Sequence, residues 1–173
     1  NAVIVEWLTS PIIYQGTRAF HDDAMDLIAK VVNRQAMVHH YRRLALSMRG
    51  RVTGGGDIIP LKKLFYVLRP LIALEWLSNH PDARFAPMHF QTLVSEVLLP
   101  EALRQDIDRL VSAKAETREL GMGQVPRSIT TFVNDGFDQF DGKAGSLDAP
   151  SSSDVARVEE FHQKWLHRLQ PVA

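Results

Sequence analysis

One stretch of the sequence, residues 60–76, combines an apolar pattern with residue types that can bind phosphate. Lys62, Tyr66 and Arg69 are spaced by four and three residues, so they share one face of a helix. An arginine can hold two phosphate oxygens, a lysine supplies a point charge, and a tyrosine can hydrogen-bond or stack on a base or ribose. This face therefore predicts contact with a phosphate or a nucleotide, and solvated surface charge is the alternative interpretation.

A second group of cationic and polar residues precedes this stretch. It consists of Arg34, His39, His40, Tyr41, Arg42, Arg43, Ser47, Arg49 and Arg51. Three consecutive glycines, at 54–56, follow the group and separate it from Lys62. Short connections favour antiparallel neighbouring helices, so the polar faces of the two helices are expected to converge in a basic cleft. Ordinary hydrogen-bonded roles for His39 and His40 are the alternative.

The elements that position these side chains are predicted to be helices, because apolar residues recur with a helical period and no run alternates over strand length. We predict an all-α protein: a single helical bundle of about seven helices with a C-terminal helix docked after a linker. Pro60 is expected in the first turn of its helix, and Pro70 is expected to kink or break it. The expected elements are a short helix or strand at 2–8 and helices at 21–31, 34–49, 60–78, 88–98, 101–119, 127–140 and 153–169. The expected units are a bundle at 1–140, a linker at 141–152 and a C-terminal helix at 153–173.

The composition restricts the classes of function. The chain has 173 residues with 20 Lys and Arg and 20 Asp and Glu, so affinity for phosphate must come from a local cluster rather than from net charge. It has no cysteine, which excludes disulfides and thiolate ligands and fits the cytoplasm, where we expect the protein. No apolar stretch approaches the roughly 20 residues of a membrane span, so no membrane partner is expected. The histidines show no metal-ligand spacing, and no intrinsic metal site is expected.

Three blocks of the sequence resemble, in order, those of a predicted nucleotidyltransferase family in the DNA polymerase beta superfamily. The blocks are Val3 to Tyr14, His39 to Tyr41 with Ser47 and Met48, and Leu61 to Leu71. Lys114 and Glu119 to Gly121 also resemble later positions of that family. The family includes members associated with RNA ligases and RNA repair, and the resemblance covers roughly residues 1–121, as the C-terminal helical part of such a protein.

The resemblance implies that this helical part closes a nucleotide cleft and serves the transfer of a nucleoside monophosphate from an NTP to an acceptor, with RNA as a candidate. Glu6 is a candidate member of that cleft, with a capping or structural role as the alternative. The nucleotide-binding residues implied at matching positions are His40, Tyr41, Lys62, Lys63, Tyr66 and Arg69.

The resemblance also implies an NTP with magnesium, held by an Asp-x-Asp pair that follows a Gly-Ser turn. Here Asp106 and Asp108 are about 200° apart around a helix and cannot chelate one ion together. We therefore expect no catalytic residue in this chain, with the metal ligands on a missing N-terminal catalytic domain. The chain alone is expected to be inactive.

Two other functions stay open at this point. Arg34 and His39 have the spacing of a small helical ribonuclease of the HEPN type, in which such a pair would stabilise and protonate a phosphate. A helical interaction domain whose cations meet an acidic partner is the other alternative. Loss of RNA cleavage on replacement of His39 would indicate the ribonuclease, whereas saturable NTP binding that depends on Lys62 and Arg69 would indicate the nucleotidyltransferase.

Overall fold

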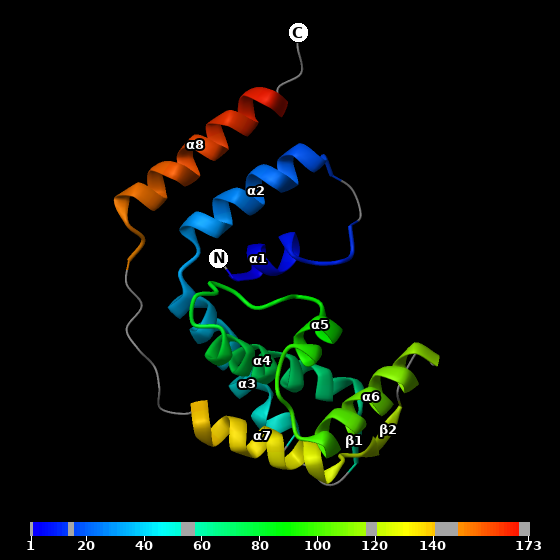
Figure 1. Ribbon diagram of the computed structural model, residues 1–173. Coiled ribbons are helices and arrows are strands. Elements are labelled where there is room, and N and C mark those ends of the chain that lie inside the picture. Colours follow the sequence, from blue (N-terminus) through cyan, green and yellow to red (C-terminus); the bar gives the residue numbers. More distant parts are fainter. Residues whose placement is uncertain (1, 14–15, 53–57, 117–120, 141–148, 170–173) are drawn as a thin grey trace.

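The structure is a computed structural model that describes residues 2–13, 16–52, 58–116, 121–140 and 149–169 (Figure 1). Within these ranges the fold is predominantly all-α, as the sequence predicts. The helices are α1 (Ala2–Leu8), α2 (Arg18–Val31), α3 (Arg34–Val52), α4 (Lys62–Asn79), α5 (Phe90–Ser95), α6 (Glu101–Glu116), α7 (Arg127–Phe140) and α8 (Ser152–Leu169), and the strands are β1 (Ile58–Pro60) and β2 (Met122–Gln124).

Helix α4 lies at the centre of the bundle, and α3 packs along it (Figure 1). Apolar residues cover most of its circumference, so it can be buried on several sides at once. Its buried residues are Leu64, Val67, Leu68, Pro70, Leu71, Ile72, Ala73, Leu74, Trp76 and Leu77. The exposed residues of α4 are therefore confined to a narrow face and to the helix ends.

A two-stranded antiparallel sheet, which the sequence does not predict, precedes α4. Ile58 pairs with Gln124, and Pro60 pairs with Met122. Pro60 is thus the last residue of a strand and not part of the first turn of α4, which corrects the sequence prediction. A proline has no N–H to donate to a ladder, and it is tolerated here because both strands of a two-stranded sheet are edge strands. The Leu61 N–H continues the pairing and donates to the Gly121 carbonyl at 3.0 Å, so the sheet fixes the start of α4.

Pro70 does not break α4, which runs continuously from Lys62 to Asn79. Of the predicted kink or break, the break is therefore absent, and the kink stays a prediction. A proline removes one helical hydrogen bond, but here the flanking residues Leu68 and Leu71 are deeply buried, and their packing holds both turns in place.

Several helix ends also differ from the prediction. Helix α2 begins at Arg18, α3 continues to Val52, and α5 spans only Phe90–Ser95. The His89 side chain caps the start of α5 by accepting a hydrogen bond from the Thr92 N–H. Residues 117–120, at the predicted end of α6, lie outside the described residues.

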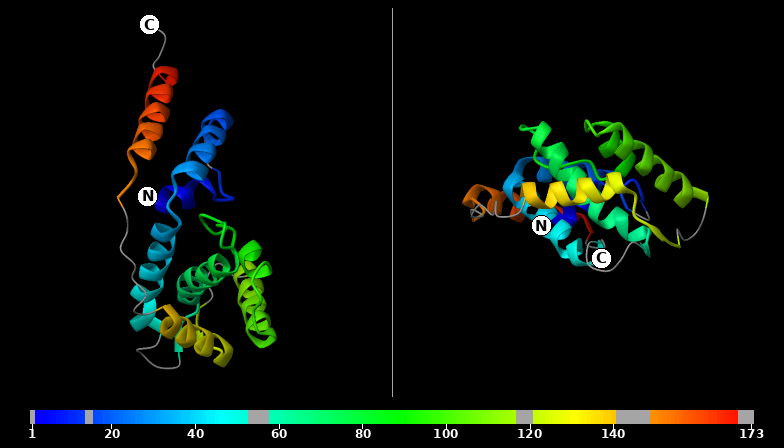
Figure 2. Two further views of the ribbon diagram at one scale, coloured as in Figure 1. Left: turned by 60° about the vertical axis from the view of Figure 1, so that its left-hand side comes forward. Right: turned by 90° about the horizontal axis from the view of Figure 1, so that it is seen from below.

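The C-terminal helix α8 lies beside α2 at one end of the molecule (Figures 1 and 2). Trp165 packs edge-on against Phe20 with ring centroids 5.1 Å apart, and its indole N–H donates to Asp23 at 3.1 Å. Lys164 also pairs with Asp23 at 2.6 Å. Most of the predicted linker, residues 141–148, lies outside the described residues, so the division into 1–140, 141–152 and 153–173 stays a prediction. No helix in the described part of the chain is long and apolar enough to cross a membrane.

Candidate functional site

The predicted phosphate-binding face lies on α4, but its two ends differ in exposure. Lys62 lies in the first turn and is exposed, and Tyr66 is 60% exposed. The Arg69 side chain, one turn further along the helix, is only 17% exposed. The sequence therefore placed the three residues on one face correctly, and the packing of other elements covers one end of that face.

Glu6 of α1 covers the Arg69 end. The Arg69 guanidinium donates to the Glu6 carboxylate at 2.9 Å, and the Glu6 side chain is 16% exposed. Arg69 also contacts the Met88 sulfur. Helix α1 is held against α2, because the His21 ring bonds the Leu8 carbonyl at 2.9 Å. A contact between residues 63 positions apart thus joins α1 to the centre of the bundle.

His40 and Tyr41 of α3 complete this cluster of polar residues. His40 Nε2 lies 3.9 Å from a Glu6 carboxylate oxygen. The interaction with His40 outweighs burial and, together with Arg69, lowers the pKa of Glu6 from its ordinary value. Glu6 is therefore ionised between two cationic or polar partners.

Tyr41 is the buried member of the cluster, at 1% exposure. Burial raises the pKa of its phenol to about 12, although the charge of neighbouring Arg69 opposes that rise. Its hydroxyl thus keeps its proton at neutral pH. Tyr41 supports Arg69 from inside the bundle, and direct contact between Tyr41 and a nucleotide stays a prediction.

A lysine of another helix contacts α4 at Phe65. Lys114 of α6 lies over the Phe65 ring, with its Nζ 4.9 Å from the ring centroid. Phe65 directly precedes Tyr66 and packs edge-on against Phe90 of α5. Lys63 of α4 is half-buried. Lys114, one of the family-like positions, is therefore brought close to α4 beside Phe65.

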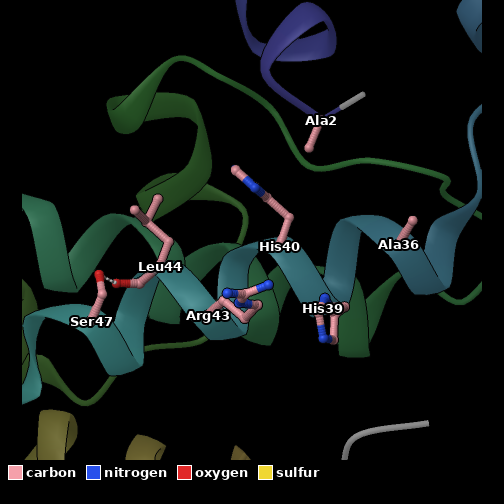
Figure 3. Close-up of a pocket in the computed structure, with 7 residues that line it drawn as sticks. All are labelled: Ala2, Ala36, His39, His40, Arg43, Leu44 and Ser47. Atoms are coloured by element: carbon pink, nitrogen blue, oxygen red, sulfur yellow. Dashed lines mark hydrogen bonds between the residues drawn. The ribbon is translucent and has the colours of Figure 1, made fainter. Parts of the chain in front are cut away.

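An open pocket of about 440 Å³ lies along α3 (Figure 3). Its lining residues are Ala2, Ala36, His39, His40, Arg43, Leu44 and Ser47. In Figure 3 the His40 side chain extends toward Ala2 of α1, while His39 and Arg43 project on another side of the helix. No α4 residue lines this pocket, so the basic cleft expected between α3 and α4 stays a prediction. His40 of the pocket and Arg69 of α4 both approach Glu6.

Sequence reasoning missed two parts of this arrangement. It did not identify Glu6 as the partner of Arg69, although Glu6 lies in a family-like block and was named as a candidate for the cleft. It gave no signal for Met88, which comes from the loop after α4 and reaches Arg69 only through the fold. The glycine loop at 54–56 lies outside the described residues.

The described residues do not fit a magnesium site. They contain no group of three or more histidine, aspartate or glutamate side chains that could hold a metal ion. Asp106 of α6 accepts a hydrogen bond from Ser128 and pairs with Arg109 at 3.2 Å, whereas Asp108 is exposed. The two carboxylates thus have separate surroundings, as expected from their spacing on a helix.

Arg34, half of the candidate ribonuclease pair, has a structural role. Its guanidinium donates to the Leu77 carbonyl at 2.5 Å and to the Ala83 carbonyl at 3.1 Å. It therefore ties the start of α3 to the end of α4 and the loop that follows. His39 lies in the α3 pocket, and no contact between it and Arg34 is described. The structure gives the ribonuclease interpretation no support.

Comparison with known proteins identifies the family of this chain. No solved structure matches it significantly. The uncharacterized protein YcgL of Bacillus subtilis (strain 168) is 30% identical over 124 residues, which are 70% of this chain and 46% of YcgL. The chain thus spans about half the length of the curated relative it matches. Residues 1–164 match the RNA repair pathway DNA polymerase beta family, and the chain belongs to that family.

Proposed function

We infer that this chain is the helical, nucleotide-contacting portion of a nucleotidyltransferase. In this proposal the complete protein transfers a nucleoside monophosphate from an NTP to an acceptor, and RNA is the acceptor that the family description favours. The carboxylates that bind magnesium belong to a catalytic domain outside this chain. The chain by itself is therefore inactive.

The observation that carries the proposal is the α4 face. Lys62 and Tyr66 are exposed there, and Arg69 continues the same face with its guanidinium held by Glu6. Lys114 adds a second lysine from α6. A tyrosine that can stack on a base, flanked by lysines that can neutralise phosphate oxygens, suits a nucleoside triphosphate.

The reaction requires these residues to position the phosphates and to neutralise their charge. The acceptor hydroxyl attacks the α-phosphorus, a new P–O bond forms, and pyrophosphate leaves with the electrons of the broken P–O bond. Such transfers depend mainly on the orientation of the phosphates and on the neutralisation of their charge. In the proposal Lys62, Lys63 and Arg69 hold the triphosphate, Tyr66 contacts the base or ribose, and His40 and Tyr41 support Arg69 or extend the contact to the nucleotide.

Calorimetric titration with ATP, CTP, GTP and UTP in magnesium buffer tests the proposal, both for this chain and for the protein with its catalytic domain present. We expect saturable binding of at least one nucleotide, weakened about tenfold or more in Lys62→Ala because an interaction with a charged group contributes about 1.5–3 kcal/mol. Lys30→Ala, an exposed lysine on α2, is the matched control and should bind like the wild type. Absence of NTP binding to the protein with its catalytic domain would refute the proposal.

A further inference from the structure

Helix α3 carries an unusual concentration of positive charge for a protein with no net charge. Its sequence, Arg34–Val52, contains five arginines and two histidines and no carboxylate. Two of these arginines have partners inside the fold: Arg34 donates to backbone carbonyls, and Arg49 lies over the Phe137 ring at 5.2 Å. The remaining charge creates a local positive field, which attracts anions even when the global charge is zero.

The α3 pocket gives solvent and ligands access to this positively charged helix. Arg43 is exposed at the pocket, and no ion pair is described for it. His39 lies one helical turn before it, and Ser47 lies one turn after it, so the three residues share one face of the helix. The Ser47 hydroxyl donates to the Leu44 carbonyl at 2.7 Å. Guanidinium and imidazole groups can both donate hydrogen bonds to phosphate oxygens.

The lining of the pocket favours a phosphodiester over a free mononucleotide. No phenylalanine, tyrosine or tryptophan is among the lining residues, and the apolar members are two alanines and Leu44. A base would find no large aromatic ring among these lining residues to stack on, because the exposed rings of Trp7 on α1 and Tyr66 on α4 are not among them. A small molecule usually buries most of its surface in its site, but this pocket is open (Figure 3). A backbone phosphate of a longer nucleic acid strand needs only cationic side chains in order to bind there.

The pocket also adjoins the α4 face. His40 lines the pocket and lies 3.9 Å from Glu6, which in turn holds Arg69 at 2.9 Å. His40 thus connects the pocket with the Arg69 end of the face proposed to bind the NTP.

We propose that the α3 pocket binds a backbone phosphate of single-stranded RNA through Arg43 and His39, and so serves as the acceptor subsite. The role as an acceptor subsite rests on the proposed nucleotidyltransferase function, whereas the binding of RNA at this pocket does not require it. Because contacts to phosphate carry no sequence information, the pocket positions the acceptor strand without selecting its sequence.

Fluorescence anisotropy with a fluorescein-labelled single-stranded RNA of about 12 nucleotides, titrated over a range of salt concentrations, tests the proposal. The protein with its catalytic domain is used, and NTP binding is measured in parallel on each variant. Arg43→Ala is expected to weaken RNA binding roughly fivefold to tenfold and to reduce the slope of log K against log salt by about 1. His39→Ala should weaken RNA binding less, and Arg43→Lys should restore most of the affinity. Arg18→Ala, at a 95% exposed arginine on α2, is the matched control. Both Arg43 and Arg18 are exposed, and thermal unfolding checks that each variant folds.

The outcomes separate this proposal from the proposed function. Weaker RNA binding in Arg43→Ala with an unchanged NTP affinity and an unchanged control supports the acceptor subsite. RNA binding that is equal in Arg43→Ala, His39→Ala and wild type overturns it, whatever the NTP titration shows. Equal losses in Arg43→Ala and Arg18→Ala also overturn it, because they indicate nonspecific attraction to exposed arginines. Loss of NTP binding on Lys62→Ala with retained RNA binding supports two separate subsites.

Discussion

Replacement of Glu6 by glutamine tests whether the contact between α1 and α4 is a structural ion pair. The substitution keeps the shape of the side chain but removes its charge, and it leaves the Arg69 guanidinium largely buried without its anionic partner. Arg69 Nε is already buried and has no hydrogen-bond partner among the described residues. Little water is available to replace the lost carboxylate, because the two side chains are only 16% and 17% exposed.

The size of the effect follows from this exposure. Exposed ion pairs contribute about 0–1 kcal/mol, and removal of one partner from a fully buried pair destabilises by about 3–5 kcal/mol. A 2.9 Å contact at this exposure lies between the two limits, so we expect Glu6→Gln to lower the free energy of unfolding by about 2–3 kcal/mol. For a protein of this size that corresponds to a decrease in Tm of about 5–10 °C.

Urea unfolding followed by far-UV circular dichroism measures the effect at neutral pH. A double-mutant cycle with Arg69→Met isolates the pair, because Arg69→Met also loses the contact with Met88 and Glu6→Gln also changes the approach of His40 to Glu6. We expect a coupling energy of about 1–2 kcal/mol. A coupling below about 0.5 kcal/mol, the value of an exposed pair, would refute the argument that this contact fixes α1 on the bundle.

Three further predictions concern acid stability, the C-terminal helix and the core. Because the pKa of Glu6 is lower in the folded protein than its usual 4.5, the contribution of Glu6 to stability is complete above the unfolded pKa and is lost as the pH falls through the folded pKa. The stability difference between wild type and Glu6→Gln should therefore shrink in acid. A constant difference in urea midpoints from neutral pH down to about pH 3 would contradict this prediction. Trp165→Ala removes the aromatic contact with α2 but lies outside the main core, so hydrogen exchange should accelerate in α8 and not in α4, and equal acceleration of both helices would show that α8 unfolds only with the bundle. Gly136→Ala places a Cβ 3.0 Å from Leu71 Cδ2, so overpacking of about 1–3 kcal/mol should outweigh a gain in helix propensity of about 1 kcal/mol, and a raised Tm would show instead that the Leu71 side chain can move aside.

The sequence was sufficient to identify the helices that carry the candidate site. Helical periodicity is a local property, and α7 spans the predicted residues Arg127–Phe140. The same periodicity placed Lys62, Tyr66 and Arg69 on one face of α4, because residues three and four apart neighbour one another on any helix. The resemblance in the blocks around these residues correctly pointed to the family.

Contacts between distant residues were decided by the tertiary structure alone. Pro60 ended in a strand because residues 122–124 pair with β1, and a pairing so short leaves no alternating pattern in the sequence. Tyr41 and Arg69 are polar enough for an exposed surface, yet the packing of α1 against α3 and α4 covers them. The spacing of residues along one helix determines the direction in which each side chain points from the helix axis. Only the arrangement of the neighbouring helices determines whether that side chain then contacts water, a carboxylate or the core.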